Sequence, residues 1–114
     1  MTSVSKVLIA KALDGLHARQ LATAQNIANA NSPGYRSIRV TFEESLRAAA
    51  GQGADAIAGV QPRTELAPVP RFADEMRLDL EIATASQTAM RYGALLTVLE
   101  SRGGLMRAVL AGAR

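Results

Sequence analysis

The strongest helical pattern in the chain is LDLEIATASQTAMRYGALLTVLESRGGLMRAVL, residues 78–110. One set of its positions recurs at alternating intervals of four and three residues, the spacing of a single helix face. These positions, called the C-terminal seam below, are Leu78, Ile82, Ala85, Ala89, Tyr92, Leu96, Leu99, Met106 and Leu110, with Gly103 in the same register. A repeat of seven keeps such a stripe facing a partner helix over a long distance. We therefore predict a long helix within residues 73–114, which kinks or ends at Gly103-Gly104.

The N-terminal third of the chain shows the same helical spacing. Its periodic positions extend to about Asn31 and are Ile9, Leu13, Leu16, Gln20, Thr23, Ile27 and Ala30. A helix over residues 73–110 measures about 57 Å at ~1.5 Å per residue, whereas a compact chain of this length has a radius of gyration of about 13 Å. The expected fold is therefore elongated and mainly all-α, with two long terminal helices in an antiparallel, coiled-coil-like hairpin.

Apolar residues of the C-terminal segment fall on more than one helix face, notably at Leu95-Leu96 and Val98-Leu99. A two-helix hairpin covers one stripe on each helix, so other chains are expected to cover the remainder. The alternative is an ordinary hairpin whose additional apolar residues close over a folded-back middle segment.

The middle of the chain is expected to hold two short elements. Ile38, Val40 and Phe42 alternate with polar residues, as in a half-buried extended segment. Thr41-x-x-Glu44 matches a capping box, which predicts a short helix over residues 42–50.

Gly and Pro residues without periodicity predict a flexible linker over residues 51–72. The predicted organisation is an N-terminal helix over 1–32, a turn, extended segment and short helix over 33–50, the linker over 51–72 and a C-terminal helix over 73–114. Both ends of the chain would form one discontinuous domain.

Composition excludes several classes of function. The 114 residues include no Cys and one His, at position 17, so zinc, iron-sulfur and Cys-His catalytic sites lack their ligands. Glu43 and Glu44 are neighbours and point about 100° apart on a helix, which suits a helix start better than a catalytic pair. The net charge of +3 is spread without a basic stripe interleaved with aromatics, which disfavours nucleic-acid binding. No catalytic residue, cofactor or metal ion is expected.

Targeting signals are equally sparse. No run approaches the ~18 consecutive apolar residues of a membrane span, so no direct membrane span is expected. The apolar run Val7–Ala10 is shorter than the roughly 7–15 residues of a signal-peptide core. Any export is therefore expected to leave the N-terminus uncleaved.

The most informative stretch is the predicted end of the first helix, which reads Asn26-Ile27-Ala28-Asn29-Ala30-Asn31-Ser32-Pro33-Gly34-Tyr35. Asn side chains near a helix end can bond unpaired backbone groups. Pro33 favours the first corner of a turn, and Gly34 supplies the positive φ that a type II turn needs at its second corner. Tyr35 then offers an apolar ring for packing and a hydroxyl for hydrogen bonding.

This string resembles the signature of bacterial flagellar axial proteins, the rod and hook family, in which Asn-Ile/Leu-Ala-Asn precedes Thr/Ser-x-Gly-Tyr/Phe. The continuation Phe42-Glu43-Glu44-Ser45-Leu46, together with Asp74-Glu75-Met76 and Ala89-Met90-Arg91-Tyr92, is similar to the proximal rod members. The resemblance covers residues 8–46 and 74–110. It departs over residues 69–73, at Gly103-Gly104, and at Leu95, where related rod and hook proteins have Asn.

The resemblance implies a non-enzymatic structural subunit of the proximal rod of the flagellar basal body, which polymerises through its terminal helices after export. The implied partners are other flagellar rod proteins, the rod adaptor, the membrane ring of the basal body and the flagellar type III export apparatus. The implied location is the periplasm-spanning rod. Two alternatives stay open: a soluble helical adaptor or regulator that dimerises through residues 78–110, and a weak basic nucleic-acid binder.

Overall fold

The computed structural model describes residues 2–68 and 78–112, with only the course of the backbone over residues 102–112. Its helices are α1 (Ser3–Ala28), α2 (Glu43–Ala50), α3 (Ala54–Ala58) and α4 (Leu78–Gly112), and its strands are β1 (Ile38–Thr41) and β2 (Arg63–Leu66). The chain is mainly helical, with a long helix at each end and a small two-stranded sheet. The expected coarse class is confirmed.

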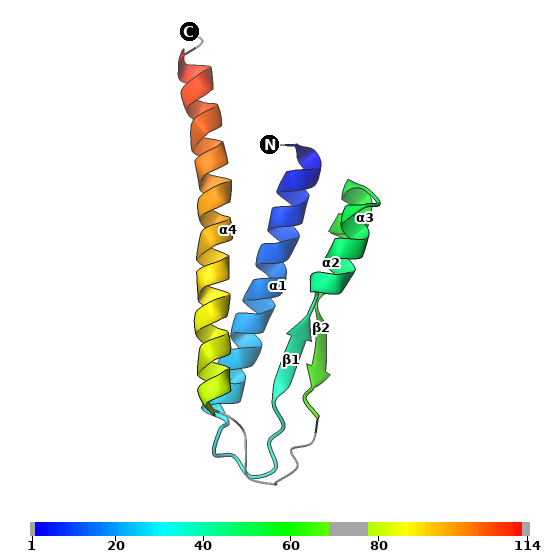
Figure 1. Cartoon of the computed structure of the whole chain (residues 1–114), viewed down its shortest axis with the longest axis vertical. Coiled ribbons are helices and arrows are strands. Elements are labelled where there is room, and N and C mark those ends of the chain that lie inside the picture. The colour runs from blue at the N-terminus through cyan, green and yellow to red at the C-terminus, as the bar shows by residue number, and fades with distance from the viewer. Residues whose placement is uncertain (1, 69–77, 113–114) are drawn as a thin grey trace.

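The two long helices lie side by side and run in opposite directions (Figure 1). The molecule measures 65 × 27 × 14 Å along its principal axes, and its radius of gyration is 17.9 Å. A compact chain of this length would have a radius of about 13 Å, so the expected elongation is confirmed. Its cause is α4, whose 35 residues make a rod of about 52 Å.

The ends of the long helices differ in part from expectation. Thr2 caps α1, because its side-chain oxygen accepts a hydrogen bond from the backbone N–H of Ser5 at 3.1 Å. α1 ends at Ala28, three residues before the expected limit at Asn31. α4 continues through Gly103-Gly104 to Gly112, and the expected entry over residues 73–77 lies outside the described residues. No helix in the described ranges is long and apolar enough to span a membrane.

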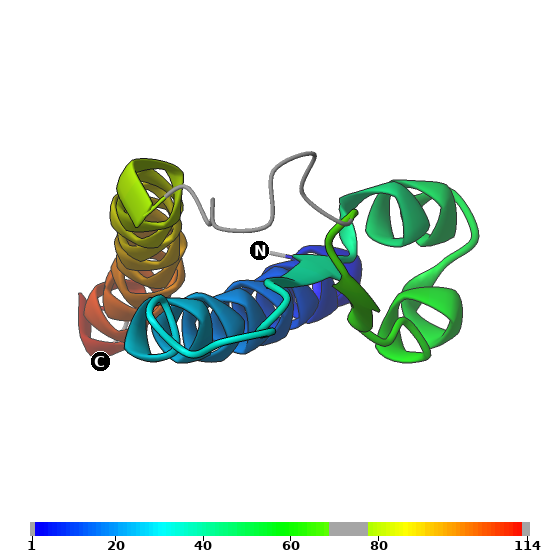
Figure 2. The ribbon, with the colours of Figure 1, turned by 90° about the horizontal axis from the view of Figure 1, so that it is seen from below.

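The core lies on one side of α1. Viewed from the end of the molecule, α1 stands between α4 and the pair α2 and α3 (Figure 2). The buried apolar residues come from α1, β1, α2 with its capping residue Phe42, and α3; they are Leu16, Ala22, Val40, Phe42, Leu46, Ala49 and Ile57. α4 adds only partly buried residues to this cluster, among them Tyr92 and Leu95. The middle segment therefore holds the core, and α4 packs along its margin.

Residues 51–68 contain the helix α3 and the strand β2, where a flexible linker was expected over 51–72. α3 places Ile57 in the core with none of its surface exposed. β2 pairs antiparallel with β1, with Ile38 opposite Leu66 and Thr41 opposite Arg63. α3 buries only one large apolar residue, and β2 pairs with a strand that is distant in the sequence. Neither feature produces a periodic hydrophobic pattern within residues 51–68, so neither could be predicted from the sequence. Residues 69–72 of the expected linker lie outside the described residues.

The start of α2 corrects the predicted capping box. β1 matches the predicted extended segment, but Thr41 is its last residue, and the capping position of α2 falls on Phe42 without a side-chain cap. The carboxylate of Glu43 instead accepts a long hydrogen bond of 3.4 Å from the Phe42 backbone N–H. Thr41 pairs within the sheet and is therefore not the capping residue of α2. The next residue, Phe42, is buried in the core, and α2 starts directly after it.

A glycine sets the distance between α1 and this core. Gly15 is buried in the middle of α1, and a Cβ atom there would lie 2.5 Å from the ring of Phe42. That distance is far below van der Waals contact. The Phe42 ring therefore occupies the space that any larger residue at position 15 would need.

Candidate functional site

The end of α1 is organised by Asn26, the first residue of the predicted motif. Its side chain is 1% exposed and makes four hydrogen bonds. The amide nitrogen donates to the Ile38 carbonyl at 2.9 Å and to the Glu81 carboxylate at 3.1 Å. The amide oxygen accepts from the Ile38 N–H and from the Tyr35 hydroxyl, both at 2.8 Å. One side chain thus joins α1, the following turn, β1 and α4.

The turn after α1 has the geometry that its sequence predicts. The Tyr35 N–H donates to the Ser32 carbonyl at 3.2 Å, which closes a four-residue turn. Gly34 has a φ of 74°, as the second corner of a type II turn requires. A Cβ at Gly34 would meet no atom within 4 Å, so backbone conformation alone selects glycine there.

Asn29 terminates α1 from the capping position. Its side-chain nitrogen donates to the Gln25 carbonyl at 2.9 Å, and its side-chain oxygen accepts from the Ser32 hydroxyl at 3.1 Å. The Asn29 backbone N–H also donates to the Gln25 carbonyl. These bonds satisfy groups that a helix end would leave unpaired, which is the role predicted for an Asn at this place.

The remaining motif residues divide into two groups. Tyr35 and Ile27 are half-buried, and the Tyr35 hydroxyl bonds Asn26 as the motif suggested. Partial burial and the nearby negative charge of Glu81 raise the pKa of Tyr35 above 10.0. The exposed motif residues are Ala28, Asn31, Ser32, Pro33 and Gly34. The motif therefore has an inner part bonded to the fold and an outer part at the surface.

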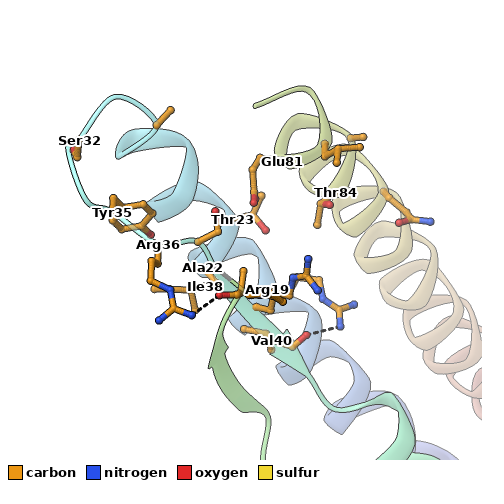
Figure 3. A pocket seen from close by; sticks show the side chains of 18 of the residues that line it. Arg19, Ala22, Thr23, Ser32, Tyr35, Arg36, Ile38, Val40, Glu81 and Thr84 are labelled. Carbon is orange, nitrogen blue, oxygen red and sulfur yellow. Dashed lines mark hydrogen bonds between the residues drawn. The ribbon is translucent and has the colours of Figure 1, made fainter. Parts of the chain in front are cut away.

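Arg19 is a second organising residue, and it was not predicted from the sequence. Its guanidinium group binds the Glu43 carboxylate through two hydrogen bonds of 2.8 and 2.7 Å. It also donates to the Val40 carbonyl at 2.8 Å (Figure 3) and lies 4.9 Å from the centre of the Phe42 ring. The hydrogen bonds from Arg19 lower the pKa of Glu43 below that of an ordinary Glu side chain.

Asn26 and Arg19 together occupy the outer edge of β1. One edge of this strand pairs with β2. On the other edge, Asn26 bonds the N–H and carbonyl of Ile38, and Arg19 bonds the carbonyl of Val40. Two side chains of α1 thus take the place of a third strand and satisfy backbone groups that would otherwise be unpaired. A signal existed in the sequence, since the two residues are seven apart and share a helix face.

The C-terminal seam does not face α1 along its whole length. Its half-buried members are Ala85, Tyr92 and Leu99, and its exposed members are Leu78, Ile82, Ala89 and Leu96. Nothing is described of the side chains at Met106 and Leu110. On the covered side of α4, Glu81 bonds Asn26 and Thr88 is 2% exposed. A partly polar stripe therefore faces α1, and much of the apolar seam lies beside it at the surface.

Two surface depressions lie between the long helices and the middle segment. The first is a trough of mixed polar and apolar lining that includes Arg19, Thr23, Tyr35, Glu81 and Thr84. Figure 3 shows Glu81 and Thr84 on α4 across from Thr23 on α1. The second, called the apolar groove below, is formed by α1, α2 and α4. Its lining residues are Leu8, Ile9, Ala12, Leu16, Phe42, Glu43, Leu46, Arg47, Ala50, Arg91, Ala94 and Leu95.

The acidic and basic side chains near these two depressions are the ones that could form a metal-binding group or ion pairs. In residues 2–68 and 78–112, no group of three or more His, Asp or Glu side chains is placed to hold a metal ion. Each charged residue that lines the apolar groove has an ion-pair partner, and Arg47 pairs with Glu44. Glu43 is bound by Arg19, and a nitrogen of Arg91 lies 3.9 Å from the same carboxylate.

No protein-family model matches this chain, and no curated protein matches it.

Proposed function

We propose that this chain is a structural subunit of the proximal rod of the bacterial flagellar basal body and polymerises through its terminal helices after export. The observation that carries the proposal is the apolar surface left uncovered on both long helices. Its large residues are Val4, Leu21, Leu78, Leu80, Ile82, Met90, Leu96 and Val98. Complete burial of one such side chain contributes about 1.5–3 kcal/mol. Contacts with other chains along these helices would therefore be strongly stabilising.

The geometry of the motif at the end of α1 supports the same proposal. Asn26 fixes the inner part of the motif by four hydrogen bonds, while Asn31 and Pro33 stay exposed at the surface. A turn that is exposed yet held in place can present a defined surface to a neighbouring subunit. The motif resembles that of flagellar axial proteins, and its continuation is most like the proximal rod protein FlgB.

The partners that follow from this proposal are the other flagellar rod proteins, the rod adaptor, the membrane ring of the basal body and the type III export apparatus. The antiparallel hairpin would act as a coiled-coil-like unit whose exposed seam is completed by neighbouring subunits. The assembled location would be the periplasm-spanning rod, reached with an uncleaved N-terminus.

The deciding experiment removes the chain from a flagellated bacterium that encodes it. The deletion is expected to abolish motility and to leave basal bodies without a complete rod by electron microscopy, and the wild-type chain is expected to restore both. The double variant Ile82→Glu/Leu96→Glu should not restore them, because it places charges on the exposed seam. Ser101→Glu, an exposed polar position on the same helix, is the matched control and should restore motility.

Normal motility of the deletion strain would rule out the rod assignment. Equal motility of the seam variant and its Ser101 control would rule out assembly through the exposed face of α4. Circular dichroism of the purified variants would establish that both retain the helical content of the wild type.

A soluble adaptor that dimerises through residues 78–110 is the second candidate, since the same exposed seam could be covered by one partner. The two candidates differ in the size of the assembly. A symmetric pair closes after two chains, whereas a rod subunit forms contacts that repeat. Sedimentation at increasing concentration would give a limiting dimer for the adaptor and a series of larger species for the rod subunit.

A further inference from the structure

The two outer edges of the small sheet differ in what covers them. Along the outer edge of β1, the side chains of Asn26 and Arg19 bond the backbone groups of the strand. β2 forms the other edge, and none of the described helices or strands runs along its far side (Figure 1). All four residues of β2 are exposed. An uncovered edge of this kind presents backbone groups with which another strand can pair.

The free backbone groups of this edge belong to Thr64 and Leu66. In an antiparallel pair, residues that exchange hydrogen bonds alternate with residues whose N–H and C=O groups point outward. The Ala67 N–H donates to the Ser37 carbonyl at 2.8 Å, which makes Ala67 an inward position. The backbone groups of Leu66 and Thr64, which alternate with it, therefore point away from β1. No described residue forms a hydrogen bond with these outward groups, so both residues are available to a further strand.

The side chains of β2 give the strand a self-complementary charge pattern. Arg63 and Glu65 lie on either side of Thr64 and share one face of the sheet. If two β2 strands run antiparallel with Thr64 opposite Thr64, the Arg63 of each copy lies opposite the Glu65 of the other. Sliding one strand by two residues, the smallest step that keeps the outward groups facing one another, sets Glu65 against Glu65 or Arg63 against Arg63. The charges therefore favour a single register.

Arg63 and Glu65 are available for these contacts. Both residues are exposed, and neither has an ion-pair partner in the part of the chain that the structure describes. Glu65 lies opposite Arg39 of β1 in the sheet register, so in the paired form it lies between two arginines. Exposed ion pairs contribute little to stability, so the backbone hydrogen bonds hold the strands together and the charges set their register. Pro62 and Pro68 lack an N–H and limit the pairing to a short segment.

We infer that β2 of one copy of this chain pairs antiparallel with β2 of a second copy, with Thr64 at the two-fold axis. The two small sheets then form one sheet of four strands. The contact is isologous and closes after two chains. It uses none of the exposed residues of α4, so it goes beyond the proposed function and is compatible with further contacts along the long helices. The opposite charges at Arg63 and Glu65, rather than exposure alone, identify a second copy as the partner.

The test uses the absence of Cys in the natural sequence. In the full chain, Thr64→Cys places one thiol at the two-fold axis, where the Cα atoms of a hydrogen-bonded pair lie about 5.5 Å apart, a separation that a disulfide can bridge. Mild oxidation is expected to give a disulfide dimer. The matched control is Thr41→Cys, an exposed position on β1, and should give several-fold less dimer. Both positions lie in the same sheet, so association through α4 does not by itself favour one over the other.

Charge reversal tests the register of the pairing. Adding Arg63→Glu to the Thr64→Cys chain makes both members of each cross-strand pair acidic, and adding Glu65→Arg instead makes both basic. Each of these variants alone is therefore expected to give several-fold less dimer than Thr64→Cys. A mixture of the two, prepared with different masses, has opposite charges in every cross-strand pair and is expected to give the mixed dimer.

Three results would overturn the inference. One is a Thr64→Cys dimer no more abundant than the dimer of the Thr41→Cys control. Another is an unchanged dimer yield after Arg63→Glu or Glu65→Arg is added, which would exclude the register that the charges favour. The third is a mixture of the two charge variants that forms no more mixed dimer than either variant forms alone. Circular dichroism of every variant checks that helical content is unchanged.

Discussion

At the scale of single residues, the structure depends on polar and small side chains more than on large apolar ones. Gly15, Arg19, Ala22 and Asn26 are spaced by four, three and four residues and form one stripe of α1. Gly15 admits the Phe42 ring, while Arg19 and Asn26 bond the edge of β1. The stripe has the period of a helix face without its usual hydrophobicity, so hydropathy did not reveal it. Each of its members can be tested separately.

Asn26→Ala is expected to lower the free energy of unfolding by about 3 kcal/mol or more, because it leaves the Ile38 N–H, the Ile38 carbonyl and the Tyr35 hydroxyl without their partner. Chemical denaturation would measure the loss. Asn31→Ala, at an exposed position of the same motif, is the control and should change stability by less than about 0.5 kcal/mol. Equal effects at the two positions would contradict the central role of Asn26.

Gly15→Ala is expected to destabilise the chain by about 1–3 kcal/mol, although alanine favours helices over glycine by about 1 kcal/mol. The new Cβ would lie 2.5 Å from the Phe42 ring, and the ring is itself 5% exposed and packed in the core. Gly93→Ala in α4 is the control: its Cβ would meet nothing within 4 Å, so this variant should be more stable than the wild type. Thermal melts compare both, and a stabilised Gly15 variant would refute the close contact.

At the scale of elements, an ion pair connects α1 to the start of α2. Arg19 holds the carboxylate of Glu43, and Arg91 of α4 lies near the same group. The Glu43 side chain is 43% exposed, so solvent screening reduces what the pair contributes. Glu43 was predicted to lie at the start of a helix, and the structure confirms this. Its partner Arg19, however, lies 24 positions away in the chain. No local pattern could identify that pairing.

The Glu43–Arg19 pair predicts a component of acid sensitivity. The hydrogen bonds from Arg19 lower the pKa of Glu43 in the folded chain below its value in the unfolded chain. The folded state therefore binds fewer protons than the unfolded state between the two pKa values. The stabilisation is complete above the unfolded pKa and is lost as pH falls through the folded pKa.

The free energy of unfolding at pH 6 and at pH 3 would measure this acid sensitivity, because the two pH values lie on either side of the ordinary pKa of Glu, about 4.3. The wild type is expected to lose more stability between them than the variant Glu43→Gln, which has no group to protonate. The control is Glu44→Gln, because Glu44 forms an exposed ion pair with Arg47 on α2. This variant should show the same pH dependence as the wild type. A wild type and Glu43→Gln with identical pH dependence would contradict the assignment.

At the scale of the whole molecule, the chain has a small core and a large apolar surface. Its core lies between α1 and the middle segment, while the exposed part of the seam on α4 remains at the surface. An arrangement of this kind gains stability from association, because binding between folded chains lowers the free energy of the folded state.

The melting temperature is therefore expected to rise with protein concentration. The double variant Ile82→Ser/Leu96→Ser should remove most of the concentration dependence that comes from the exposed seam, with little effect on the melting temperature of the dilute chain, since both residues are exposed in the monomer. Calorimetry over a hundredfold range of concentration, about the range that mass action requires, would measure both. A wild-type melting temperature that does not change with protein concentration would show that association does not stabilise the folded chain.

Features that depend on local spacing and backbone preference could be predicted from the amino-acid sequence alone. These are the two long helices, the extended segment at Ile38–Val40, the turn at Gly34 and the roles of Asn29 and Tyr35. Periodicity and turn chemistry are properties of neighbouring residues, so they can be read without a fold.

The covered face of each helix and the position of the core depend on three-dimensional packing and could not be predicted from the sequence. Ile57 fills the core from a segment without periodicity, and Arg19 and Asn26 take the place of a strand beside β1. The apolar seam of α4 is turned partly away from α1 because Asn26 and Glu81 fix the helix pair through a polar contact. Such pairings join residues far apart in the chain, and their choice depends on packing and hydrogen bonding in three dimensions.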